Sequence, residues 1–260
     1  MGFRTAKIVL FFELTKRNCP KGAIMGQKDF AMSPGFCIFA NKKDMPFYNK
    51  FFSIAAAILL ASCSGGGSRR SDEAPGLETG DLIFVSDTSG MGSAVMAATG
   101  RFSHVAIVEH TDSGLYVWEA VPGKGVICSR LADFLADQGC DSATLMSPSE
   151  EGLLRLMRPA AEYDTARLRA LLHEHLGQPY DDYFMPDNGR TYCSELAEEC
   201  FCNSDGRRIF ATEPMNFRDA EGRMPEYWTR WFDSLGTAIP EGTPGTNPNS
   251  IFSQCREVGF

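Results

Sequence analysis

Three residues of this 260-residue chain could perform nucleophilic chemistry together: His104, Glu119 and Cys193. His104 opens the apolar run VAIV, Glu119 interrupts the apolar run YVWEAV, and Cys193 begins the helix-forming run CSELAEECF. A cysteine in such a place can serve packing alone, because free cysteine is among the most buried residue types. It can also be a nucleophile, because a helix N-terminus and a nearby protonated imidazole both stabilise a thiolate.

A local hairpin can bring the imidazole to the carboxylate. We expect strands at 103–110 and 114–121, and a four-residue loop at 110–113 would place His104 directly opposite Glu119. Opposed residues of an antiparallel pair share a face, with Cβ atoms about 5 Å apart, whereas a slip of one residue moves the partner to the other face. Glu119 also needs a partner, because burying an unpaired charge is costly. We therefore predict that a carboxylate orients an imidazole that serves the cysteine.

The elements that must position these residues follow from hydrophobic spacing and from helix start and stop signals. A helix after the N-cap Asp164 carries an apolar stripe that includes His175, which we interpret as a satisfied histidine at the edge of the core. The other expected elements are strands at 80–87, 125–129 and 152–159, helices at 91–100, from about 131, at 193–201 and within 224–232, and a turn-rich wrap at 238–251. This pattern predicts an α+β fold, with helices packed against a small antiparallel sheet.

Charge is unevenly distributed along the chain. Residues 1–62 carry nine Lys or Arg and three Asp or Glu, whereas residues 63–260 carry sixteen basic and thirty acidic residues. A body this acidic is a poor candidate for nucleic-acid binding. With 43% hydrophobic and 22% charged residues, the chain has the composition of one generous globular domain or two small ones.

We interpret residues 45–62, in the positively charged first part of the chain, as a lipoprotein signal peptide. Lys50 precedes an apolar run at 51–61 that has the length of a signal-peptide core and is short for a bilayer span. The run ends in Leu-Ala-Ser-Cys, which resembles the lipobox of bacterial lipoproteins and marks Cys63 for lipidation; the alternative is a buried helix that ends in cysteine. The segments expected are an untranslated or disordered extension at 1–44, a signal peptide at 45–62, a flexible tether at 63–76 and a folded domain at 77–260.

The remaining cysteines give no strong signal. Once the upstream pair, Cys63 and Cys193 are set aside, five are left, and an odd number does not support a closed disulfide framework. The sequence leaves open whether disulfides form among Cys128, Cys140, Cys200, Cys202 and Cys255. A Cys-x-Cys pair without a second ligand pair at a plausible spacing also argues against a metal site.

Five ordered blocks, ETGDLIF, FSHVAIV, VWEA, LGQPYDDYF and YCSEL, resemble the circularly permuted papain-like amidases and cysteine peptidases of the NlpC superfamily, relatives of the lecithin retinol acyltransferase-like enzymes. The resemblance covers about residues 77–255 and implies that 77–260 is a permuted papain-like catalytic domain with a half-barrel sheet. It implies that Cys193 is the nucleophile, that His104 is the general base and acid, and that Glu119 orients the imidazole. Tyr180 and Tyr192 are weaker candidates for oxyanion or substrate contacts.

The resemblance implies a lipid-anchored thiol hydrolase of the bacterial cell envelope, facing the periplasm or the surface, which cleaves an amide bond through an acyl-enzyme. A peptidoglycan stem peptide and a lipid amide are both open as substrates. An acyltransferase or lipid esterase on the same fold is an alternative, as is a non-catalytic ligand-binding lipoprotein. This chemistry requires no metal or organic cofactor, the membrane is contacted through the lipid anchor, and the oligomeric state is unknown.

Overall fold

The computed structural model describes residues 76–147, 149 and 152–259. The expected extension, the signal peptide and the tether with Cys63 lie outside the described residues, apart from Gly76 at the end of the tether. Within the described ranges, no helix combines the length and the apolar character needed to cross a membrane.

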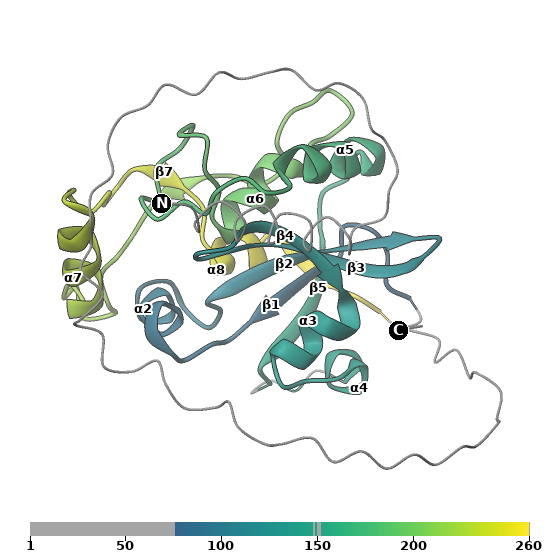
Figure 1. Ribbon diagram of the computed structural model, residues 1–260, viewed down its shortest axis with the longest axis horizontal. Coiled ribbons are helices and arrows are strands. Elements are labelled where there is room, and N and C mark those ends of the chain that lie inside the picture. Colours follow the sequence, from purple (N-terminus) through teal and green to yellow (C-terminus); the bar gives the residue numbers. More distant parts are fainter. Residues whose placement is uncertain (1–75, 148, 150–151, 260) are drawn as a thin grey trace, which may run out of the picture. The chain divides into compact units, whose positions relative to one another are not determined.

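The described elements follow the expected order along the chain (Figure 1). The strands and helices that the sequence bounded are confirmed, with ends that move by no more than three residues. The expected turn-rich wrap at 238–251 differs, because it includes most of a short helix. The short elements that the sequence did not predict are Ser142–Met146, Glu213–Pro214, Pro244–Gly245, Pro248–Phe252 and Cys255–Glu257. The elements are β1 (Leu82–Val85), α2 (Gly90–Thr99), β2 (His104–Thr111), β3 (Gly114–Val121), β4 (Gly125–Arg130), α3 (Leu131–Asp137), α4 (Ser142–Met146), β5 (Leu154–Pro159), α5 (Thr165–His175), α6 (Cys193–Cys200), β6 (Glu213–Pro214), α7 (Glu226–Leu235), β7 (Pro244–Gly245), α8 (Pro248–Phe252) and β8 (Cys255–Glu257).

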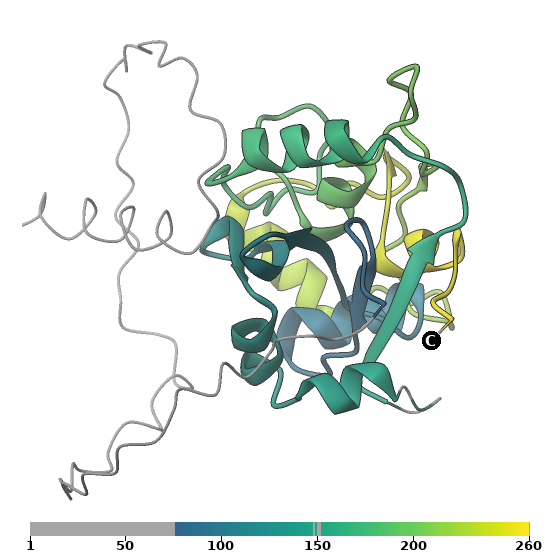
Figure 2. The ribbon, with the colours of Figure 1, turned by 90° about the vertical axis from the view of Figure 1, so that its right-hand side faces the viewer.

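The architecture is an antiparallel sheet covered by helices on both faces, which confirms the α+β prediction. In the described part the sheet has six strands in the order β4-β3-β2-β1-β5-β8, and each neighbouring pair is antiparallel. Figures 1 and 2 show α5 and α4 on opposite sides of this sheet. One core cluster joins the sheet to α5, α6 and α7, and a second joins its other face to α3 and α4.

The register of the central hairpin differs from the expected one. Thr111 pairs with Gly114 and Ile107 pairs with Trp118, so a two-residue turn joins the strands and the pairing is shifted by two positions. His104 is therefore not directly opposite Glu119. The reason is that a tight two-residue turn matches the twist of the flanking strands better than the four-residue loop that we assumed. Because side chains alternate with a period of two, an even shift keeps both residues on one face.

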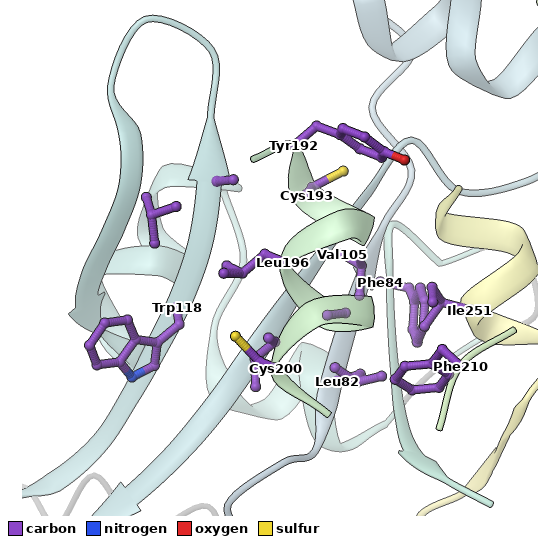
Figure 3. Packing of buried hydrophobic residues seen from close by; sticks show 14 of the residues in the cluster. Leu82, Phe84, Val105, Trp118, Tyr192, Cys193, Leu196, Cys200, Phe210 and Ile251 are labelled. Atoms are coloured by element: carbon purple, nitrogen blue, oxygen red, sulfur yellow. The ribbon is translucent and has the colours of Figure 1, made fainter. Parts of the chain in front are cut away.

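Helix α6 lies in the centre of the first core cluster (Figure 3). All of its residues except Glu199 are buried. Leu196 and Cys200 extend along the helix from Cys193 and pack among side chains of the sheet such as Val105 and Trp118. Burying apolar surface stabilises a fold by about 25 cal/mol per Å², so the position of this helix is set mainly by packing.

Candidate active site

The candidate nucleophile occupies the first position of a buried helix. Cys193 begins α6, and Tyr192 precedes it in an extended conformation with φ −98° and ψ 173°. Figure 3 shows the Cys193 side chain at this end of the helix. The first N–H groups of a helix have no partner within it, and they point toward a place where negative charge is favoured. Cys193 is 8% exposed, so its sulfur is sheltered but lies at a cavity wall.

His104 connects the sulfur to a carboxylate. Its Nε2 lies 2.8 Å from Oε2 of Glu119, and the Cys193 side chain lies close enough to the ring to raise its pKa. The structure thus brings together the three residues that the sequence singled out, although the hairpin register differs from the expected one.

Electrostatics in this group favour a charged imidazole. Burial by itself lowers the pKa of His104, but the hydrogen bonds to Cys193 and Glu119, together with their negative charges, raise it to about 10. His104 is therefore an imidazolium at neutral pH, paired with the Glu119 carboxylate and close to the Cys193 sulfur. A protonated imidazole beside a cysteine is the arrangement that makes a thiol reactive.

A cavity of about 250 Å³ adjoins these three side chains. Alternation along the strands directs His104 and Glu119 toward the face of the second core cluster, away from α6. Both residues still line the cavity, because they lie near the ends of their strands and the cavity extends around this end of the sheet. Val85, the last residue of β1, belongs to the second core cluster and lines the cavity as well. The site is therefore built at the end of the sheet, where the start of α6 meets the first residue of β2.

The two tyrosines that the sequence marked as weaker candidates both line this cavity. Tyr180 is 7% exposed, and its hydroxyl donates only a long contact of 3.8 Å to the Met91 sulfur, a weak acceptor. Burial raises the pKa of Tyr180 well above its usual value, so it keeps its proton. The Tyr192 hydroxyl accepts a hydrogen bond from the backbone N–H of Thr246 at 3.2 Å, and burial raises its pKa as well.

Other residues considered in the sequence lie away from the cavity. His175 is hydrogen-bonded through Nδ1 to Gln178, and its Nε2 lies 3.7 Å from Glu199, in agreement with a structural role at the edge of the core. Cys200 and Cys202 are buried and form no disulfide. Across the described ranges, no group of three or more His, Cys, Asp or Glu is arranged to hold a metal ion.

Sequence reasoning missed two buried carboxyl groups that shape the site. Asp181 is fully buried and accepts hydrogen bonds from the backbone N–H groups of Tyr183 and Met185, which fixes the loop that leads to Cys193. Glu195 lies in the first turn of α6, 6% exposed, and burial raises its pKa to about 9. A local signal existed for Asp181, because aspartate often binds backbone N–H groups two or more residues ahead in a turn. None existed for Glu195, which the helical pattern did not mark as buried.

Comparisons with known proteins agree with this fold. Residues 76–256 match the family described as "Permuted papain-like amidase enzyme, YaeF/YiiX, C92 family". The "Uncharacterized protein YiiX" of Escherichia coli (strain K12) is 26% identical over 176 residues, which cover 67% of this chain and 81% of that protein. The crystal structure titled "metalloprotein yiiX" from Escherichia coli O157:H7 has a TM-score of 0.56 at 24% identity, covering 71% of this chain and 97% of that one, and shows a shared fold.

Proposed function

The chain belongs to the permuted papain-like amidase family, and from this premise we propose that it is a cysteine hydrolase that cleaves an amide bond at Cys193. One observation carries the proposal: His104 is hydrogen-bonded to Glu119 and interacts with Cys193, and all three side chains meet at the wall of one cavity. A cysteine that served packing alone would not need this arrangement, because two partly buried charges must be satisfied beside it.

The first half of the reaction forms an acyl-enzyme. The Cys193 thiolate attacks the carbonyl carbon, a C–S bond forms, and the carbonyl electron pair moves onto oxygen. The N–H groups at the start of α6 and the Tyr180 hydroxyl supply donors for this oxyanion. The His104 imidazolium then gives its proton to the amide nitrogen as the C–N bond breaks, and the amine leaves.

The second half returns the enzyme to its starting state. Neutral His104 accepts a proton from water as the water oxygen attacks the thioester carbonyl. The C–S bond breaks, the carboxylic acid leaves, and the sulfur is again a thiolate beside an imidazolium. Glu119 holds the ring in the required orientation in both halves and stabilises its positive charge.

Selective alkylation tests the proposal. Iodoacetamide at pH 6, followed by peptide mass spectrometry, should modify Cys193 faster than Cys255, since burial raises the pKa of the Cys255 thiol to about 12. His104→Ala should slow labelling of Cys193 and leave Cys255 unchanged. Equal labelling of the two cysteines in the wild-type protein would remove the main support for a nucleophilic role.

Activity provides the second test. Incubation with muropeptides and with N-acyl amides, followed by mass spectrometry, should detect amide cleavage that Cys193→Ala abolishes and that His104→Ala reduces by about 10²–10⁴-fold. Cys140→Ala is a matched control, because this thiol is partly exposed and lies outside the cavity. Cleavage that survives in Cys193→Ala would contradict the assignment of the nucleophile.

We also propose that the protein is a lipoprotein of the bacterial cell envelope, anchored through Cys63. The support comes from the sequence alone: a basic residue, a short apolar run, a lipobox-like ending and a polar tether, residues 64–76, that can separate the domain from a membrane. Cys63→Ser should abolish labelling by radioactive palmitate and release the protein from membrane fractions. Labelling that persists in this variant would show that the anchor is elsewhere.

A further inference from the structure

We propose that this cavity selects amides with an apolar acyl group and a leaving amine that carries a further positive charge, and that it discriminates against a carboxylate beside the scissile bond. This inference rests on the proposed function and narrows its substrate class. It favours an N-acyl diamine or polyamine over a stem peptide, whose residues carry carboxylates.

The charges on the cavity wall are the first observation. The charged side chains that line it are Asp87, His104, Glu119 and Glu213, and no Lys or Arg is found among its described lining residues. The positive charge of His104 is already paired with the Glu119 carboxylate. A substrate carboxylate would therefore meet acidic groups and no free cation, whereas an ammonium group would find a partner.

The chemistry fixes where the leaving amine lies. Because His104 must hand its proton to the departing nitrogen, that nitrogen lies on the His104 side of the sulfur. Asp87 lies near the same end of β2 as His104, since its backbone N–H donates to Ser103 Oγ at 2.8 Å, Ser103 precedes His104 in the chain, and all three residues line the cavity. The Asp87 carboxylate accepts hydrogen bonds from Ser89 but pairs with no Lys or Arg in the described part of the chain, so it is available to an ammonium group.

The second carboxylate has a similar environment. Glu213 Oε1 accepts a hydrogen bond from Asn247 Nδ2 at 2.7 Å, and within the described residues Glu213 has no cationic partner. Both Asp87 and Glu213 are exposed, so their effect is screened by solvent and is moderate in size. They contribute selectivity between substrates of different charge more than raw affinity.

The rest of the wall suits an apolar acyl group. Met91, Val95 and Ala98 follow the i, i+4, i+7 spacing that places them on one side of α2, and all three line the cavity. Phe184, Phe217 and Trp228 add aromatic surface to the wall. Since the leaving amine occupies the His104 side, these apolar walls are left for the acyl part of the substrate.

Three amides that share a hexanoyl group test the inference: those of ethylenediamine, which is cationic, of propylamine, which is neutral, and of β-alanine, which is anionic. We expect kcat/KM to fall in that order, by about tenfold from first to last, since an exposed ion pair contributes a few-fold. Asp87→Asn should reduce the preference for the cation, and high salt should reduce it in the wild-type protein. Asp112→Asn, in the exposed turn between β2 and β3, removes the same charge outside the cavity and should keep the full preference.

Two further measurements separate the inference from the proposed function. 4-Nitrophenyl hexanoate has no charged leaving amine, so a hexanoyl adduct on Cys193 in the intact mass tests the hydrolase alone. If the adduct forms but the three amides react equally, or the anionic one reacts fastest, the charge inference is wrong and the hydrolase stands. If no adduct forms, calorimetry of the three amides with Cys193→Ser still decides: tighter binding of the cationic amide supports the inference, and equal or tighter binding of the anionic amide overturns it.

Discussion

Replacing Glu195 by Gln should make the protein more stable at neutral pH. Glu195 is 6% exposed, its Oε2 accepts a 3.3 Å hydrogen bond from the Tyr192 N–H, and burial together with the charge of Glu199 raises its pKa to about 9. The folded protein therefore keeps a proton that the unfolded chain releases above its ordinary pKa of 4.5. The folded state binds more protons between these two values, so the free energy of unfolding falls as pH rises from 4.5 to about 9.

The size of the effect follows from the distance between the two pKa values. The ordinary pKa of glutamate lies about 2.5 pH units below pH 7, and each unit is worth about 1.4 kcal/mol, so retaining the proton costs at most about 3.5 kcal/mol. A glutamine has nearly the same shape, can still accept from the Tyr192 N–H and carries no such cost. We expect Glu195→Gln to gain about 1–3 kcal/mol at pH 7, little at pH 5, and more at pH 8.

Urea unfolding followed by tryptophan fluorescence at pH 5, 6, 7 and 8 measures this difference directly. Glu174→Gln is the matched control, because Glu174 is exposed on α5 and its replacement should leave the curves unchanged. A Glu195→Gln protein that is no more stable at pH 7 and 8, with the same pH dependence as the wild type, would show that Glu195 is not held neutral by its burial.

Three other substitutions test the physical reading of the fold and the site. Glu119→Gln should lower the pKa of His104 from about 10 by roughly 1–3 pH units, because it removes a nearby negative charge, and an NMR titration of the ring would detect this. Asp164→Ala should cost about 1 kcal/mol in urea unfolding, because the carboxylate caps α5 at the N–H groups of residues 166 and 167. Trp118→Phe should cost about 1.5–3 kcal/mol, because buried Glu109 then loses the 2.8 Å hydrogen bond from the indole, and unchanged stability would mean that water or Arg169 replaces it.

The sequence predicted the parts of the fold that local patterns control. The strands around His104 and Glu119 and the helix after Asp164 were readable because apolar spacing and capping residues act over a few residues. The helix α8 was missed within a turn-rich stretch, although Asn247 as a cap and Pro248 at the first helical position are helix-start signals. Strand β8 could not be predicted, because a three-residue edge strand depends on a partner, β5, that lies about a hundred residues earlier in the chain.

The candidate site was predictable in its members but not in its surroundings. The pairing of His104 with Glu119 was predicted from a hairpin whose register was wrong by two positions. The prediction of their contact still held, because a register error of two keeps both side chains on the same face of the sheet. A register error of one would have placed them on opposite faces. The acidic wall residues Asp87 and Glu213 could not be assigned to the site from the sequence, since they belong to loops and short strands that only the tertiary fold brings to the cavity.

The contact between His104 and Glu119 and the approach of Cys193 to them depend on different parts of the fold. His104 and Glu119 are fifteen residues apart on neighbouring strands, so a hairpin can bring them together at a small cost in chain entropy. Cys193 comes from a helix much later in the chain, and in the described part no carboxylate of α6 forms a salt bridge with the hairpin. Burial of nearly the whole of α6 against the sheet must therefore supply the free energy that brings the sulfur to the imidazole. The reactivity of the thiol is for this reason a property of the packed core, and a relative that orders its strands and helices differently can build the same group of side chains.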